Sequence, residues 1–245
     1  MMFSDIFKNL FDEKKSVGRK GERLTGDILK SSDISGRILK NLYVPTNNGE
    51  TSEIDMIYIT RKGILVIESK NYSGSVSGKI QDTLWVQKFP NGTENTFYNP
   101  VMQNAAHIKY LEDFLKYEIP MFSFIVFSDK CSLKKFRPSK STFIVKRDGL
   151  TAAMDNVMRN NEDFISDSEI NSIFSQLKPL TKVKKSVKKA HVENINRKYN
   201  SDSPECPLCG SKLVLRTASK GSHKGEKFYG CSAYPKCRYI TEVIK

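Results

Sequence analysis

Four cysteines near the end of the 245-residue chain have the spacing of metal ligands. Cys206 and Cys209 are separated by 2 residues, Cys231 follows after another 21, and Cys237 comes after a further 5. Thiolates are soft ligands, and four of them at tetrahedral corners suit a structural Zn²⁺ ion. Two disulfides are the alternative, which the Cys-x2-Cys spacing and a reducing cytosol disfavour. The pattern therefore predicts a small fold held together by zinc.

A second group of residues that could do chemistry lies more than a hundred residues upstream, in a predicted hairpin. Short apolar runs at Ile54–Thr60 and Gly63–Lys70 flank Arg61 and Lys62. Two such runs around a tight turn are typical of a β-hairpin. Its outer ends carry the charged side chains of the motif.

The register of this hairpin decides which charged side chains meet. A two-residue turn pairs Thr60 with Gly63, and the same count places Asp55 opposite Glu68. Because side chains alternate along a strand, Glu68 and Lys70 share a face, and that face also holds Asp55. A loop one residue longer would put Asp55 on the opposite face.

Two carboxylates directly opposed on a strand pair are destabilising unless a cation lies between them. Mg²⁺ binds carboxylate oxygens together with water and phosphate oxygens, and such an ion polarises a phosphodiester and activates water. We therefore expect Asp55 and Glu68 to bind Mg²⁺ or Mn²⁺. Lys70 would orient the attacking water or stabilise charge in the transition state. The alternative is a simple ion pair between Lys70 and one carboxylate at a sheet edge.

The elements around the hairpin predict a mixed α/β domain over residues 1–178. Helices are expected at Gly18–Lys30, Asn104–Lys116, Thr151–Arg159 and Ser168–Leu177, and further buried strands at Phe122–Phe127 and Thr142–Val145. Met1–Phe11 is apolar on one face, and we expect a short helix packed on its own domain; a weak membrane-surface contact is the alternative. No stretch has the roughly 18 to 20 uncharged apolar residues that span a bilayer. A cytoplasmic protein without a membrane partner is expected.

Positive charge is concentrated towards the C-terminal end of the chain. The formal net charge is +13, and residues 182–245 carry 15 Lys and Arg against 5 Asp and Glu. A basic segment gains free energy by releasing the counterions of a polyanion, so nucleic acid is the expected partner. Residues 179–203 are basic and poor in apolar side chains, which predicts a flexible linker before the finger at 204–245. A solvated helix continuing from the domain is the alternative.

Aromatic and basic residues alternate around the four cysteines. The stretches Cys-Pro-Leu-Cys-Gly at 206–210 and Lys-Phe-Tyr-Gly-Cys-Ser-Ala-Tyr-Pro-Lys-Cys-Arg-Tyr at 227–239 resemble the four-cysteine zinc finger at the C-terminal end of bacterial type I topoisomerases. The resemblance implies a zinc ribbon that binds DNA, often single-stranded. Side chains that could stack on bases or neutralise phosphates are Lys227, Tyr229, Tyr234, Lys236 and Arg238. Some of the aromatic residues must instead form the small core of the ribbon.

Five separated blocks of the first domain resemble the nuclease-related domain in order and distance. They are Gly18-Arg-Lys-Gly-Glu22-Arg, Glu53-Ile-Asp55, Val66-Ile-Glu68-Ser-Lys70-Asn71-Tyr-Ser-Gly74, Trp85 and Asn99-Pro100-Val-Met-Gln103-Asn104, within about residues 15–117. That family is similar to restriction-endonuclease-like nucleases of the PD-(D/E)xK type, which implies a mixed sheet flanked by helices.

The same resemblance assigns roles to single residues. It implies that Asp55 and Glu68 are metal ligands and that Lys70 is the catalytic lysine. Glu22 would join the acidic cluster, and Gln103 would lie at the edge of the site. Ser69 departs from the apolar residue that is more usual in the family.

The leading hypothesis is a Mg²⁺-dependent nuclease that acts on DNA, single-stranded or structured, held by the finger. The rivals are a non-catalytic DNA-binding protein on a nuclease-like scaffold and an accessory protein that brings a topoisomerase or replication protein to DNA. Residues 74–78 lack the Gly-Lys-Ser/Thr ending of a phosphate loop, so use of ATP is not expected. His107 and His191 are predicted to lie on a helix surface or in the linker.

Overall fold

The computed structural model describes residues 3–116, 118–134, 140–199, 206, 211–218, 225, 227–235 and 239–242, with side chains from residue 16 to 194 and from 206 to 240 within these ranges. The helices are α1 (Phe3–Ser31), α2 (Pro100–Leu115), α3 (Leu150–Asn160), α4 (Asp167–Leu177) and α5 (Lys185–Tyr199), with short 3₁₀ helices η1 (Arg147–Gly149) and η2 (Lys178–Thr181). The strands are β1 (Gly36–Pro45), β2 (Thr51–Thr60), β3 (Gly63–Lys70), β4 (Gly74–Ser77), β5 (Leu84–Lys88), β6 (Glu94–Tyr98), β7 (Met121–Phe127), β8 (Cys131–Leu133), β9 (Thr142–Lys146), β10 (Leu213–Thr217), β11 (Lys227–Cys231) and β12 (Ile240–Glu242).

A mixed five-stranded sheet with the order β1-β2-β3-β7-β9 forms the centre of the first domain. β1, β2 and β3 are antiparallel neighbours, whereas β3, β7 and β9 run parallel. The apolar run of β3 is buried from Gly63 to Ile67, as expected for a strand covered on both faces. The predicted mixed α/β class, with a sheet flanked by helices, is confirmed.

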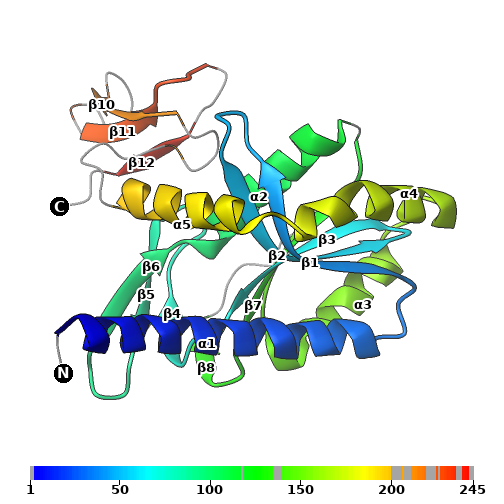
Figure 1. The fold of residues 1–245 in the computed structure, drawn as a ribbon, viewed down its shortest axis with the longest axis horizontal. Helices are drawn as coiled ribbons and strands as arrows, with labels where there is room; N and C mark the ends of the chain where they lie inside the picture. The colour runs from blue at the N-terminus through cyan, green and yellow to red at the C-terminus, as the bar shows by residue number, and fades with distance from the viewer. Residues whose placement is uncertain are drawn as a thin grey trace.

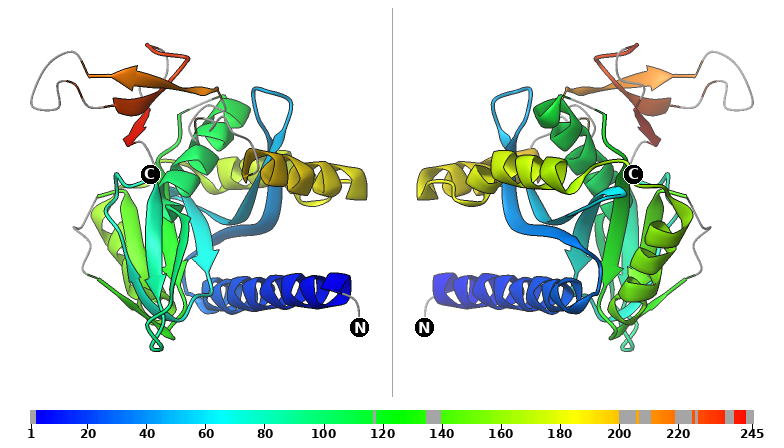
Figure 2. Two further views of the ribbon diagram at one scale, coloured as in Figure 1. Left: turned by 90° about the vertical axis from the view of Figure 1, so that its left-hand side faces the viewer. Right: turned by 90° about the vertical axis from the view of Figure 1, so that its right-hand side faces the viewer.

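Helices cover both faces of this sheet (Figures 1 and 2). One apolar cluster joins β-strand residues such as Ile54 and Val66 to Leu111 of α2 and Ile173 of α4. A second cluster joins Met56 and other strand residues to α1 and α3 on the opposite face. The open end of the hairpin, where β3 finishes, therefore lies between two packed layers.

A smaller four-stranded sheet with the order β6-β5-β4-β8 extends the domain beside β7. Trp85 fills its core, where the indole lies parallel to the Phe127 ring with centroids 6.3 Å apart and donates from Nε1 to the carbonyl of Lys79 at 2.9 Å. Its strand β6 ends one residue before the N-cap of α2, Asn99. The Asn99 side chain caps the helix by accepting a hydrogen bond from the Val101 amide. It fixes the start of α2, on which part of the candidate site depends.

The segment that we expected to be an open linker is helical over α5, and that expectation needs correction. His191 is buried against β2, where Nδ1 donates to the carbonyl oxygen of Thr51 at 2.8 Å. Its ring also packs edge-on against Tyr43, with centroids 5.6 Å apart. Lys185, Lys188 and Lys189 of α5 are exposed, so water screens their mutual repulsion while one face of the helix is anchored. The domain boundaries at 178 and 204 remain a prediction.

We expect His191→Ala to loosen α5 without disturbing the central sheet. The variant loses a hydrogen bond and an aromatic contact, which together stabilise the docked helix by about 1 to 2 kcal/mol. Amide hydrogen exchange over residues 185–199 should accelerate by about tenfold or more, while β2 and β3 stay protected. Lys189→Ala on the exposed side of α5 is the control and should change exchange little. Equal exchange rates in both variants would show that His191 does not anchor the helix.

The described part of the finger is a three-stranded antiparallel sheet with the order β10-β11-β12. In Figure 1 its short strands lie at the upper left, above α5. None of the helices in the described ranges combines the length and apolarity that crossing a membrane demands.

Candidate metal centre and nucleic-acid interface

The hairpin that carries the charged residues closes with a tight turn. Thr60 at the end of β2 pairs with Gly63 at the start of β3, as the sequence predicts. Gly63 has a φ of +126°, and a Cβ atom there would lie 2.1 Å from the carbonyl oxygen of Pro120. Only glycine permits this approach, so the closed end of the hairpin is fixed.

This register brings Asp55 and Glu68 together at the open end. Met56 and Ile67 form the last recorded pair of the ladder, which makes Asp55 and Glu68 the next two positions. The Asp55 carboxylate accepts the backbone N–H of Ser69 at 2.8 Å. The two predicted metal ligands thus lie side by side, while their role as ligands stays a prediction.

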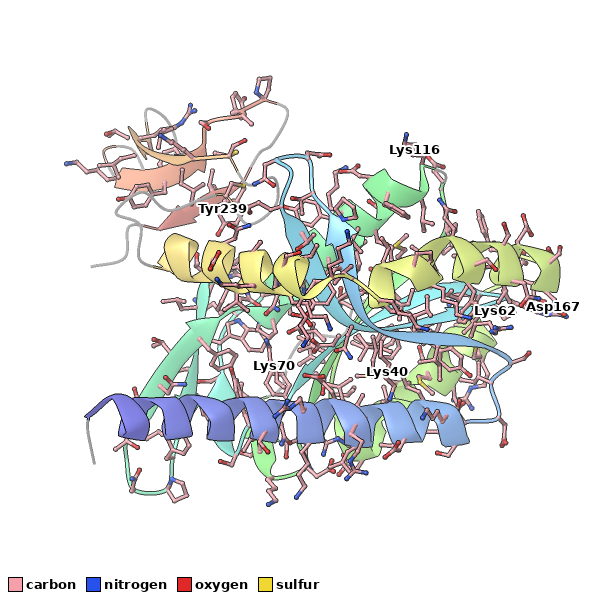
Figure 3. The ribbon with its side chains drawn as sticks, in the orientation of Figure 1. Lys40, Lys62, Lys70, Lys116, Asp167 and Tyr239 are labelled. Carbon is pink, nitrogen blue, oxygen red and sulfur yellow. The ribbon has the colours of Figure 1, made fainter. Side chains whose placement is uncertain are left out.

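Lys70 connects this carboxylate pair to α2. Its Nζ lies 2.7 Å from Oε1 of Glu68 and donates to Oε1 of Gln103 at 2.9 Å. Glu68 and Lys70 therefore share a face of β3, as expected from strand alternation. Figure 3 places Lys70 in the middle of the molecule, far from Lys62 and Asp167. The structure brings Gln103 into contact with the motif, where the resemblance placed it only at the edge.

His107 also belongs to this site, although the sequence analysis placed it on a helix surface. The imidazole is 6% exposed, with Nε2 3.2 Å from Oε2 of Glu68 and Nδ1 2.7 Å from Oγ of Ser52. Gln103 and His107 are four residues apart on α2, so both face the end of β3. That spacing was the one signal in the sequence that could have found His107.

Glu22 is held near the cluster by a close approach of α1 to the end of β3. A Cβ on Gly21 would lie 2.6 Å from Cβ of Asn71, and the Asn71 amide donates to the carbonyl of Val17 at 2.8 Å. Burial raises the pKa of Glu22, and the charges of Glu53 and Glu68 raise it further. Glu22 therefore lies close enough to Glu53 and Glu68 to interact with them electrostatically.

Ser69 has a polar partner that explains its departure from an apolar residue. Its hydroxyl lies 3.1 Å from Oγ1 of Thr25 on α1, on the side of β3 away from Glu68. The buried Arg147 donates from Nε to the same Thr25 oxygen at 3.4 Å and from Nη2 to Asn71 at 3.3 Å. Sequence patterns gave no sign of Arg147, because it reaches the site from η1, far along the chain.

The negative charges of Asp55 and Glu68 repel each other, and a bound cation would reduce this repulsion. Burial raises the pKa of Asp55, and the negative charge of Glu68 raises it further. Lys70 and the hydrogen bond from the Ser69 amide lower this pKa, but by less, so it stays well above its usual range. Burial would also raise the pKa of Glu68, but Lys70 and His107 lower it to about 2. Burial disfavours the Lys70 ammonium, yet its attraction to Glu68 keeps the pKa above the ordinary value. Asp55 is the member whose negative charge is poorly compensated.

The donor set at this end of the hairpin fits Mg²⁺ or Mn²⁺. Carboxylate oxygens each offer about two lone pairs, so the contacts of Asp55 and Glu68 leave acceptor capacity for a cation. Among the residues that the structure describes, no group of three or more His, Cys, Asp and Glu side chains is arranged to hold a metal ion. Two carboxylates suit an ion that keeps several waters and phosphate oxygens, rather than one enclosed by protein ligands.

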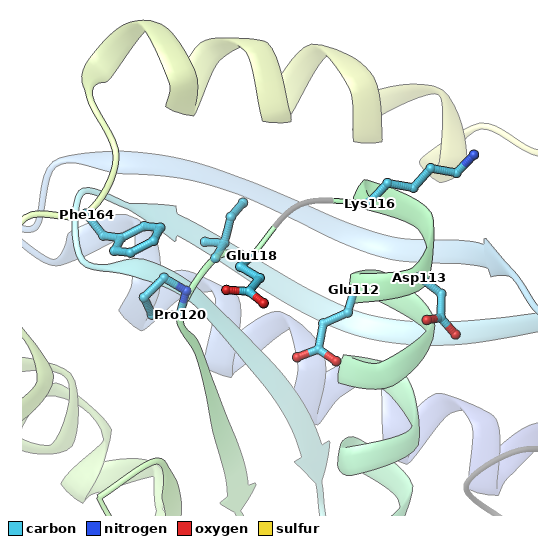
Figure 4. A pocket seen from close by; sticks show the side chains of 7 residues that line it. Glu112, Asp113, Lys116, Glu118, Pro120 and Phe164 are labelled. Carbon is cyan, nitrogen blue, oxygen red and sulfur yellow. The ribbon is translucent and has the colours of Figure 1, made fainter. Parts of the chain in front are cut away.

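A pocket of 560 Å³ lies elsewhere, at the opposite end of β3 and α2 (Figure 4). It is lined by Glu112, Asp113, Lys116, Glu118, Ile119, Pro120 and Phe164. None of the candidate site residues lines it, and its three carboxylates would repel a phosphate backbone. The candidate centre lies instead at the other end of β3, an interior strand between β2 and β7.

The zinc finger has a minimal core built around its cysteines. Cys206 and Cys231 are buried together with Leu213 and Tyr239. The amide of Ala233 donates to Sγ of Cys231 at 3.4 Å, the kind of contact that stabilises a thiolate. Of the four predicted zinc ligands, Cys209 and Cys237 lie outside the described residues.

The predicted DNA contacts of the finger differ in exposure. Lys227 is exposed, and the Tyr234 ring is 61% exposed with the guanidinium of Arg216 6.0 Å from its centroid. Tyr229 is half-buried against the core of the finger. Lys236 and Arg238 lie outside the described residues. Tyr234 is therefore the described tyrosine best placed for stacking on a base.

The finger packs against the start of α2, beside the candidate centre. The Tyr239 hydroxyl lies 3.4 Å from Oγ1 of Thr83 and donates to Sδ of Met102 at 3.8 Å. Met102 precedes Gln103, which holds Lys70. Figure 3 shows Tyr239 at the inner edge of the finger, towards the first domain.

The fold and the site define a mixed α/β domain with a carboxylate–lysine centre, joined to a small cysteine finger. Comparison with protein families gives both parts a name. The chain carries a nuclease-related domain over residues 17–128 and a topoisomerase DNA-binding C4 zinc finger over residues 203–244. Both resemblances drawn from the sequence motifs are confirmed.

Individual relatives match either most of the chain or only a small part of it. A Bacillus anthracis protein described as uncharacterized is 29% identical over 187 residues, which cover 76% of this chain and 86% of the relative. DNA topoisomerase 1 of Methanocaldococcus jannaschii is 48% identical over 40 residues, 16% of this chain and 5% of the topoisomerase. DNA topoisomerase 1 of Mycoplasma genitalium is 31% identical over 84 residues, 34% of this chain and 11% of the topoisomerase. No solved structure matches the chain.

Proposed function

We propose that this protein is a divalent-metal-dependent nuclease that cleaves DNA held by its zinc finger. The observation that carries the proposal is the convergence of Asp55, Glu68 and Lys70 at the open end of one hairpin. A buried carboxylate, a half-buried carboxylate and a half-buried ammonium in one place are costly to a fold, and such arrangements are concentrated at functional sites. The nuclease-related domain supports the same reaction class.

Each residue of the centre has a part in this proposal. Asp55 and Glu68 would hold Mg²⁺ or Mn²⁺, which when bound polarises a phosphodiester and lowers the pKa of a bound water. Lys70, fixed between Glu68 and Gln103, would stabilise negative charge that develops on the phosphate or orient the attacking water. Glu22 would add negative potential that favours a cation at the centre.

The finger would bring DNA to this centre. Tyr234 and Lys227 offer a stacking ring and a cation, the pair of contacts that binds single strands without sequence preference. Contacts of Tyr239 with Thr83 and Met102 hold the finger beside α2, so bound DNA would lie near Lys70. The finger matches the topoisomerase DNA-binding C4 zinc finger over residues 203–244, and DNA is the partner that this match favours. A cytoplasmic location and a topoisomerase or replication partner remain proposals.

One observation favours the non-catalytic alternative. In the described part of the chain the centre has two carboxylates rather than a set of three or more metal-binding side chains. Glu68 also pairs with Lys70 already, so the pair could serve only to stabilise the end of β3. The two functions differ in whether DNA is cut.

A cleavage assay separates them. Full-length protein is incubated with single-stranded, duplex, nicked and branched DNA and with RNA, in Mg²⁺, Mn²⁺ or EDTA. We expect cleavage of at least one DNA in either metal and none in EDTA. Lys70→Ala should reduce the rate by about 10²- to 10³-fold without weakening DNA binding, because charge stabilisation by one donor is worth that much. Lys62→Ala, at the closed end of the hairpin, is the matched control and should cut normally. Metal-replete wild type that binds but never cuts would establish the non-catalytic function.

A further inference from the structure

Two side chains of α2 contact opposite ends of the Glu68–Lys70 pair. Gln103 accepts from Nζ of Lys70 at 2.9 Å, and one helical turn later Nε2 of His107 lies 3.2 Å from Oε2 of Glu68. The helix that carries them is itself fixed, because the buried Asn104 amide donates to the Val66 carbonyl at 2.9 Å. α2 therefore acts as a rigid support for the side chains at the end of β3.

The hydrogen bonds around His107 determine which ring nitrogen carries a proton. An ionised carboxylate can only accept, and the ammonium of Lys70 2.7 Å from Oε1 keeps Glu68 ionised. Nε2 of His107 must therefore be the donor to Oε2. In the neutral ring Nδ1 is then an acceptor, and the Ser52 hydroxyl 2.7 Å away supplies its proton.

The remaining contact of His107 is consistent with this direction of hydrogen bonding. The Gln103 side-chain nitrogen lies 3.5 Å from Nε2, at the limit for a hydrogen bond and longer than the contact with Glu68. Both nitrogens are donors once Nε2 carries its proton, so this approach is not a bond. In the neutral ring with its proton on Nε2, the hydrogen bonds run from Ser52 through His107 to Glu68, with each member donating to the next.

We propose that His107 is a positioning residue of the nuclease centre, which aims the Glu68 carboxylate at the catalytic metal through a proton that Ser52 fixes on Nε2. The inference rests on the proposed function. His107 touches neither substrate nor reacting atoms, and it acts through Glu68. Lys70 alone holds one oxygen of Glu68 and would allow the carboxylate to rotate about that contact. His107 holds the second oxygen and so defines the plane in which the free lone pairs lie.

Loss of a residue that supports a metal ligand lowers metal affinity or activity by a typical factor. Residues that hydrogen-bond a metal ligand typically contribute 10- to 100-fold in metal affinity or activity. We therefore expect His107→Leu, which fills the same space without a donor, to weaken Mn²⁺ binding by about 10- to 100-fold and to lower kcat with little change in KM. His107→Gln keeps an N–H that can reach Glu68 and should recover part of the loss. Ser52→Ala should cost only a few-fold, because the ring stays in place.

The experiment uses full-length protein and three readouts. Calorimetric titration with Mn²⁺ gives metal affinity, with Asp55→Asn defining the part of the signal that belongs to this centre. Cleavage kinetics give kcat and KM, and ¹⁵N NMR of the metal-free protein shows which imidazole nitrogen of His107 is protonated. Leu111→Ala, a buried residue of α2 in the apolar cluster, is the control for general loss of stability.

Each outcome separates the inference from the function on which it rests. If wild type binds and cleaves, but His107→Leu matches Leu111→Ala in Mn²⁺ affinity and kcat, His107 is only structural and the inference is overturned. Protonation of Nδ1 alone in the NMR spectrum would overturn it as well. If Mn²⁺ binding is absent or survives Asp55→Asn, the proposed function fails, and the positioning role falls with it.

Discussion

Replacement of Asp55 by Asn is expected to slow metal-dependent cleavage strongly and, at the same time, to make the metal-free protein more stable. Burial and the neighbouring Glu68 raise the pKa of Asp55, which means that its negative charge is unfavourable in the folded protein. An asparagine removes that charge but keeps an oxygen that can accept the Ser69 amide. Stability and activity should therefore move in opposite directions, as they do where a fold retains an unfavourable group for its function.

The environment of Asp55 sets the expected changes in stability and in cleavage rate. Relief of a poorly compensated buried charge should stabilise the fold by about 1 kcal/mol or more, which corresponds to about 2 to 4 °C in Tm for a domain of this length. Loss of a carboxylate ligand should lower the cleavage rate by about 10²- to 10³-fold, because a catalytic metal contributes several kcal/mol. Differential scanning calorimetry in EDTA and the cleavage assay in Mg²⁺ measure the two effects.

Asp163→Asn provides the matched control. Asp163 is exposed and pairs with Lys62 at 2.8 Å, so its charge is favourable in the folded state. Its pKa is lowered by the hydrogen bond from Lys62, the opposite direction to Asp55. This variant should lose a little stability and keep full activity. A lower Tm for Asp55→Asn in EDTA would contradict the electrostatic account of the centre, whatever the activity.

The core of the candidate site could be predicted from sequence because its determinants are local. Asp55, Glu68 and Lys70 belong to two strands joined by a two-residue turn, so the register follows from counting once the turn is known. The five-block resemblance added Glu22 and Gln103, which lie on separate helices. Helices and strands with clear apolar periodicity, such as α2 and β7, were likewise found near their true bounds.

Two residues that reach the centre from distant elements, His107 and Arg147, were not predicted. His107 was assigned to a surface because the sequence does not show which face of α2 meets β3. Arg147 arrives from η1 and contacts Thr25 across 122 positions of sequence. The expected strict alternation is also interrupted in β2, where Ile54 and Ile57 enter the same apolar cluster. The residue opposite Asp55 in the neighbouring strand, Asn41, has a φ of +53°, a local distortion of the kind found beside active sites.

The packing of α5 and of the finger against the first domain limits the directions from which DNA could reach the candidate centre. A flexible linker would raise the local concentration of DNA without fixing its direction. The structure instead anchors α5 through His191 and the finger through Tyr239, so the finger does not move freely relative to the first domain. DNA held by the finger would then enter the centre from the side of α2. Cleavage should occur at a constant distance from the bound segment.

Removal of zinc is expected to unfold the finger while leaving the first domain folded. The described part of the finger has an apolar cluster of four buried side chains, two of them cysteines, and three short strands. A unit of about forty residues cannot bury enough apolar surface to fold without a metal or disulfides. Zinc binding contributes about 10 to 16 kcal/mol in comparable fingers, so the loss is decisive for this part of the chain. Circular dichroism and elemental analysis after chelation, with one zinc per chain at the start, measure it.

The effect of finger loss on cleavage shows whether the finger only delivers DNA to the centre or also takes part in catalysis. Cys231→Ser should weaken DNA binding by about 10²-fold, since the contribution of a tethered second site is of that order. Cleavage should fall at low DNA concentration and approach the wild-type rate at saturation, because Asp55, Glu68 and Lys70 stay in place. Cys131→Ser is the control, since this buried thiol lies outside the finger and burial raises its pKa to about 11. A Cys231→Ser variant that stays slow at saturating DNA would mean that the finger is part of the catalytic machinery, because delivery alone is overcome by mass action.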